Sequence, residues 1–119
     1  MKIAISSTGD TLEAQIDPRF GRAKTFIIWD SETDGFEAVD NAQNLNAAQG
    51  AGIQSAQNVV EKGCKAVVSG HLGPRAFSAL KSAGVKVYIG AGGTVGDAIK
   101  NYKEGSLKET DSPDVQGHW

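Results

Sequence analysis

The sequence AVVSGHLGPRAFSAL, residues 66–80, decides the fold because it passes from a strand pattern to a helix pattern within a few residues. Residues 66–69 form a short apolar run typical of a buried strand, and residues 76–80 have the spacing of a helix. Pro74 suits the first position of a helix, where its missing N–H is not needed. The stretch therefore predicts a tight turn at the carboxyl end of a strand, where open α/β sheets bind their ligands.

The rest of the chain shows the same two patterns. Strands are expected at residues 2–6, 25–30, 36–39, 65–69 and 85–89, and helices at residues 49–62, 74–83 and 94–103, the last capped by Thr94. The apolar positions of the first helix are Ile53, Ala56, Val59 and Val60, and those of the second are Ala76, Phe77, Leu80 and Ala83. Asp34-Gly35 signals a hairpin, and the crossover rule makes the last two strands parallel. The predicted fold class is α/β: a ribonuclease-H-like mixed five-stranded sheet in the order 3-2-1-4-5, with strand 2 antiparallel and three helices.

Length and composition restrict the class of protein. The 119 residues suffice for one domain, expected at residues 1–105, and residues 106–119 are expected to form a polar, flexible or loosely docked tail. The net charge of −2 argues against nucleic-acid binding. No apolar run approaches the roughly 18 residues of a membrane span, and the first residues do not resemble a signal peptide. Cys64 is the only cysteine, so we expect no internal disulfide and a cytoplasmic setting. We also expect a monomer.

Four loops are predicted to meet at one edge of the sheet: residues 7–24, 41–49, 70–74 and 90–93. The three helices also begin at this edge, so their positive dipole ends point into the same region. The three arginines of the chain, Arg19, Arg22 and Arg75, all fall there, and Lys24 joins them. Arginine suits recognition of a fixed anion, so the edge is a candidate anion site. The alternative is that Arg19 and Arg22 simply pair with Asp10, Asp17 or Asp30.

Glycine and histidine extend this candidate site. Gly50 and Gly52 open the first helix, Gly73 precedes the second, and Gly92 and Gly93 precede the third. Small residues let a ligand approach backbone N–H groups, although glycines at helix ends are often purely structural. His71 can donate, accept or bind a metal, or it can be an ordinary loop histidine. No catalytic set is expected, because the first strand ends in Ser6-Ser7 rather than an acid and Cys64 lies at the opposite edge from His71.

Three motifs together resemble the nitrogenase iron–molybdenum-cofactor biosynthesis accessory family. They are DPRFGRA at residues 17–23, the segment from Asn46 through Gly50-Ala51-Gly52, and GHLGP at residues 70–74. The resemblance covers about residues 1–105. It implies a ribonuclease-H-like fold without the nuclease, and binding or carriage of an anionic metal–sulfur cluster rather than catalysis. It further implies a non-covalently bound molybdenum–copper sulfide cluster of the thiomolybdate type, and a possible protein partner that receives it.

A cluster of this kind needs no thiolates from the protein, because its sulfides already complete the metal coordination. It needs donors, positive potential and low-dielectric walls. Phe20, Leu72 and Ile16 are expected to supply the walls, and His71 to donate to a sulfide or approach a metal. The expected binding set is Arg19, Phe20, Arg22, Lys24, Gly50, Gly52, His71, Leu72, Gly73, Arg75, Gly92 and Gly93. The alternatives are a protein-interaction module on the same fold and an enzyme acting on a small phosphorylated ligand.

Overall fold

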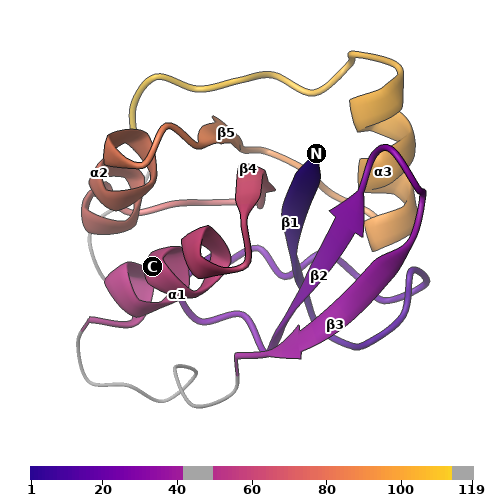
Figure 1. Cartoon of the computed structure of the whole chain (residues 1–119), viewed down its shortest axis with the longest axis horizontal. Helices are drawn as coiled ribbons and strands as arrows, with labels where there is room; N and C mark the ends of the chain where they lie inside the picture. Colours follow the sequence, from indigo (N-terminus) through magenta and orange to yellow (C-terminus); the bar gives the residue numbers. More distant parts are fainter. Residues whose placement is uncertain (42–49, 114–119) are drawn as a thin grey trace.

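The structure, a computed structural model, describes residues 1–41 and 50–113 and contains one sheet with helices on both faces (Figure 1). The strands are β1 (Lys2–Ser7), β2 (Thr25–Asp30), β3 (Phe36–Asp40), β4 (Cys64–Val68) and β5 (Lys86–Tyr88). The helices are α1 (Ala51–Glu61), α2 (Pro74–Ser82) and α3 (Val95–Lys103). Every element expected from the sequence is present, with ends that differ by a few residues.

The sheet has the order β3-β2-β1-β4-β5. β2 is antiparallel to both β1 and β3, whereas β4 is parallel to both β1 and β5. This confirms the predicted order and strand directions. Because β1, β4 and β5 run the same way, the loops that follow them leave from one edge of the sheet.

Alternate residues of the strands feed two separate cores. Ala4, Phe26 and Val67 face α1 and α2, where they pack against side chains such as Val59 and Leu80. Their neighbours along the strands face α3 instead and pack there; they include Ile3, Ile5, Ile27, Trp29, Ala66 and Val68. Since successive side chains of a strand point to opposite faces, both faces of the central strands are buried.

Most of the apolar positions expected on α1 and α2 are buried, but two are exposed. Val60 keeps 36% of its surface exposed and Ala83 is exposed, whereas Ser55 of α1 is buried. The reason is that α1 lies against α2 as well as the sheet, and its inner face carries a serine that apolar periodicity does not register. The predicted strand at residues 85–89 is also shorter, because Val85 donates its N–H to Leu80 of α2 rather than to a neighbouring strand.

The chain continues along β5 after α3. Glu109 bridges to Tyr88 in the antiparallel sense, and the N–H of Thr110 donates to Val87 at 2.8 Å. Leu107 packs against the core on the α3 side. Part of the expected tail therefore lies against the sheet, while residues 114–119 are outside the described residues. None of the helices in residues 1–41 and 50–113 has the length and apolar content that a membrane crossing requires.

Candidate functional site

Two loops far apart in the sequence are joined at the carboxyl edge of the sheet. The N–H of His71 donates to Pro18 at 2.7 Å, and the N–H of Phe20 donates to His71 at 3.2 Å. These bonds make Arg19 and His71 the paired residues of a short parallel ladder. Paired residues of a parallel bridge lie opposite each other, so both side chains leave from the same place at this edge.

Gly70 makes this close approach possible. A Cβ at this position would lie 2.7 Å from the Cα of Pro18 and 3.0 Å from its carbonyl oxygen. Only a residue without a side chain lets the two backbones come this near. The loops at residues 17–24 and 70–75, expected to form two opposite walls of the site, are therefore in direct backbone contact at Pro18 and Gly70.

Buried serines hold this layer to the end of the sheet. Ser6 Oγ donates to the Asp17 carbonyl at 2.7 Å and shares a hydrogen bond of 2.9 Å with Ser69 Oγ. The Asp17 N–H donates back to the Ser6 carbonyl at 2.9 Å. Ser6 and Ser69 have no exposed surface. Sequence reasoning missed both serines, although a polar residue at the end of an apolar strand was a signal for them.

Arg19 is both paired and accessible. The Asp17 carboxylate accepts the Arg19 N–H at 2.9 Å, and the same oxygen lies 3.6 Å from Arg19 Nε. The Arg19 side chain still keeps 42% of its surface exposed. Pairing with Asp17 was expected as the alternative to anion binding, but the exposed part of Arg19 can still contact an anion. Arg22 is half-buried, and Lys24 and Arg75 are exposed.

The N-terminus of α3 is closed by the protein itself. Thr94 Oγ1 accepts the Asp97 N–H at 3.1 Å, and the Asp97 carboxylate accepts the Thr94 N–H at 3.0 Å. The N–H groups of Val95 and Gly96 donate to the carbonyls of Ala14 and Leu12. The expectation that all three helix N-termini supply donors is therefore wrong for α3, because the loop after β1 uses those donors first.

The glycines before α3 serve its cap. Gly93 has a φ of +83°, which favours glycine, and a Cβ there would meet the Asp97 carboxylate at 2.5 Å. Its carbonyl accepts the Ile16 N–H at 2.9 Å. Gly92 is exposed and its missing side chain faces open space.

The N-termini of α1 and α2 are in contact with each other, and neither is capped by a side chain within the described part of the chain. Their N-cap residues are Gly50 and Gly73. A Cβ on Gly52 would lie 3.2 Å from the Cβ of Ala76 and 3.8 Å from its nitrogen. The first turns of the two helices therefore meet, and their positive dipole ends add in one place. Arg75 lies in the first turn of α2.

Phe20 and Leu72 do not line this surface. Both side chains are fully buried, and the Phe20 ring lies 5.1 Å from that of Phe26. They belong to the core beneath α1 and α2. The structure thus corrects the expectation that they form walls in contact with a ligand: each anchors its loop from below. Ile16, the third expected wall, is also buried.

A buried polar group that sequence reasoning missed fixes the loop carrying Arg22. Asn41 Nδ2 donates to the Ala23 carbonyl at 2.9 Å and to Ser55 Oγ at 3.1 Å. Ser55 Oγ in turn donates to the Gly21 carbonyl at 3.0 Å. Residues 21–24 are therefore tied to α1. No local pattern marks Asn41 or Ser55, because their partners lie far along the chain.

Among residues 1–41 and 50–113, metal-ligating side chains do not gather at this edge. No group of three or more His, Cys, Asp and Glu side chains occurs in the described residues. Cys64 is buried at the far end of β4, and burial raises the pKa of its thiol to about 11. What the edge offers is cationic and N–H donors, which suits an anion that already carries its own metal ligands.

Known proteins resemble the chain over almost its whole length. The sequence profile of the dinitrogenase iron–molybdenum cofactor family matches residues 1–105. An uncharacterized protein from Methanocaldococcus jannaschii is 30% identical over 111 residues, which cover 92% of this chain and 91% of that protein. The apo form of the orange protein from Desulfovibrio gigas has a TM-score of 0.93 and 36% identity, with 96% of each chain covered. A Thermotoga protein solved by NMR has a TM-score of 0.85 and 40% identity, with 98% of each chain covered.

Proposed function

Because the chain belongs to the dinitrogenase iron–molybdenum cofactor family, we propose that it binds and carries an anionic, molybdenum-containing metal–sulfur cluster without catalysis. The observation that carries the proposal is the contact between the N-termini of α1 and α2, which no side chain of residues 1–41 and 50–113 caps, close to the Arg19–His71 pair. Two adjacent helix N-termini attract an anion through their dipoles and first-turn N–H groups. Arg19 and Arg75 add fixed positive charge.

The ligand that suits this donor set is a molybdenum–copper sulfide of the thiomolybdate type, held without covalent bonds. Its sulfides accept hydrogen bonds and already coordinate the metals, so the protein need supply only donors and positive potential. His71 would donate to a sulfide or approach a metal at the rim. The other expected contacts at this end are Arg22, Lys24, Gly50, Gly52 and Gly73. Gly92 and Gly93 would contribute only as the support of α3.

The biological setting follows from the same proposal. The binding domain would be residues 1–105, with a ribonuclease-H-like fold, and residues 106–119 would be an appended tail. The protein would act as a cytoplasmic monomer that delivers its cluster to a protein partner. The family match over residues 1–105 supports the extent of the domain, and the strand order supports its fold class.

Titration with tetrathiomolybdate and copper(I) tests the proposal. The unaltered chain should bind and gain visible charge-transfer bands, and the change Arg75→Ala should weaken binding about tenfold, because it removes a charged donor from the first turn of α2. Arg19→Ala should act in the same direction. Lys100→Ala, which removes an exposed cation from α3 away from this edge, is the matched control and should leave the affinity unchanged. An unaltered chain that gains no bands at low salt would disprove the proposal.

A further inference from the structure

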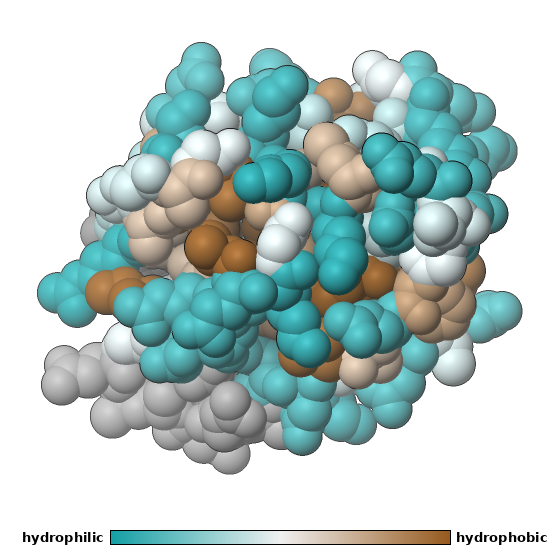
Figure 2. Space-filling model, viewed as in Figure 1, coloured by the Kyte–Doolittle hydropathy of each residue, from teal (hydrophilic) through white to brown (hydrophobic). Residues whose placement is uncertain are grey.

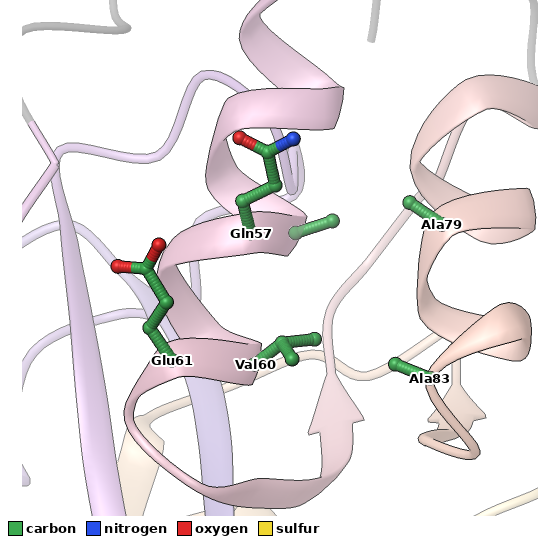
Figure 3. Close-up of a pocket in the computed structure, with 6 residues that line it drawn as sticks. Gln57, Val60, Glu61, Ala79 and Ala83 are labelled. Atoms are coloured by element: carbon green, nitrogen blue, oxygen red, sulfur yellow. The ribbon is translucent and has the colours of Figure 1, made fainter.

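A groove between α1 and α2 lies outside the proposed cluster site. It has a volume of about 550 Å³ and is lined by Ala56, Gln57, Val60, Glu61, Ala79 and Ala83 (Figure 3). In Figure 3 Val60 and Ala83 point toward each other across it, while Glu61 lies on the outer side of α1. Figure 2 shows a hydrophobic floor between the two helices with hydrophilic residues around it. Val60 is one of the few large apolar side chains exposed in the described part of the chain.

The last described residues, 109–113, run toward this groove. Residues 109–110 run antiparallel to β5, so the residues after Thr110 proceed toward the start of that strand. The start of β5 follows Ala83, the residue that ends α2 and lines one end of the groove. The yellow end of the described chain in Figure 1 accordingly reaches α2.

The six residues beyond Pro113 have a suitable length and composition. Fully extended, they span up to about 20 Å, which is comparable to the length of a three-turn helix. Their sequence is DVQGHW, so they end with a large aromatic residue and place a histidine beside it. Trp119 offers apolar area for the groove floor, and His118 offers a donor for the Glu61 carboxylate at the rim.

We propose that residues 114–119 of the same chain occupy the groove between α1 and α2, with the Trp119 ring over Val60 and Ala83. Docking removes Val60, Ala79 and Ala83 from water, and the short connection from Thr110 keeps the local concentration of the segment high. The proposal does not depend on what the opposite ends of the two helices bind.

Fluorescence of Trp119 in the full chain tests the proposal. Trp29 is fully buried, so the difference between the unaltered chain and Trp119→Phe isolates the emission of Trp119. That emission should be blue-shifted and several-fold less quenched by acrylamide than a free indole. Val60→Glu should return the quenching to the level of a free indole, because it places a charge on the groove floor. Ser78→Glu, which adds the same charge to an exposed position of α2 outside the groove, should not.

A second measurement keeps the test independent of how well the variants fold. In the unaltered chain, NMR should show contacts between the Val60 methyl groups and the Trp119 ring. Full quenching of Trp119 in the unaltered chain, or protection that survives Val60→Glu, would overturn the proposal. Protection that disappears on dilution would overturn it too, since the occupant would then be a second copy of the chain.

Discussion

Gly70 is the residue at which the two loops of the candidate site come closest. Replacing it with alanine puts a Cβ 2.7 Å from the Pro18 Cα, and backbone atoms cannot turn aside as a flexible side chain can. The His71–Pro18 hydrogen bond must lengthen, and we expect Gly70→Ala to lower the free energy of unfolding by about 1–3 kcal/mol. Urea unfolding measures this change.

Gly92→Ala is the matched control for Gly70→Ala. The new methyl group would point into open space, and the effect should stay within about 0.5 kcal/mol. Equal losses in the two variants would mean that the loops adjust freely and that the ladder is not rigid.

Residues show most clearly where sequence reasoning succeeds and where it stops. Arg19 and His71 were expected at the same edge, because both follow strands that end there, and the structure pairs them. Ser55 was not expected to be buried, since a serine on an amphipathic helix is ordinarily assigned to the solvent side. Its partners, the Gly21 carbonyl and Asn41, are brought to it only by the tertiary fold.

At the scale of the element, α3 differs from α1 and α2 because it caps itself. The hydrogen bond from the Thr94 backbone N–H is the main cause that lowers the pKa of Asp97 from its usual value of 3.8. A carboxyl whose pKa is lower in the folded chain stabilises the fold above its unfolded pKa, and this stabilisation is lost as the pH falls through the folded value. Acid should therefore weaken the first turn of α3.

Asp97→Asn tests this dependence on pH. Asparagine keeps an acceptor for the Thr94 N–H but has no charge, so the stability gap between the unaltered chain and Asp97→Asn should be largest at neutral pH. The gap should close below pH 3.8, as followed by urea unfolding at several pH values. Asp30 and Asp34, whose pKa values are also lowered, are present in both proteins and cancel. Glu104→Gln, at the other end of α3, controls for loss of one negative charge; a gap that ignores pH would contradict the cap.

The positions of the helices and strands were predicted better than the contacts that their ends make. Alternating apolar residues predict the strands, and the crossover rule predicts that β4 and β5 are parallel, because both act within or between neighbouring segments. The full strand order was expected from the likeness to ribonuclease-H-like folds. The bonds from Val95 and Gly96 to residues 12–14 were not predictable, since the loop after β1 has no periodic pattern to show where it runs. That loop takes up the first N–H groups of α3.

On the scale of the whole molecule, Cys64 reports how the structure opens. It is the single cysteine, it is 2% exposed, and burial raises its thiol pKa to about 11. A thiolate is the reactive form, so labelling by a disulfide reagent at mildly alkaline pH should be slow in the folded chain and should speed up with urea in step with global unfolding.

A control peptide containing a free cysteine sets the rate expected for the unfolded chain. Labelling of the folded chain at close to that rate would show that the start of β4 opens locally, without the rest of the sheet. Labelling that follows global unfolding would instead place β4 in the most protected part of the molecule.

The ladder between residues 18–20 and His71 has a consequence for selectivity. Ordering one backbone residue costs about 1–2 kcal/mol of conformational entropy. Here that entropy is lost during folding, so it does not weaken the binding of a ligand. The backbone of the rim is therefore preorganised before a ligand binds, whereas the Arg19 side chain, 42% exposed, can still adjust. For the proposed cluster site, we expect this fixed backbone to favour a compact, rigid polyanion over bulk phosphate or sulfate.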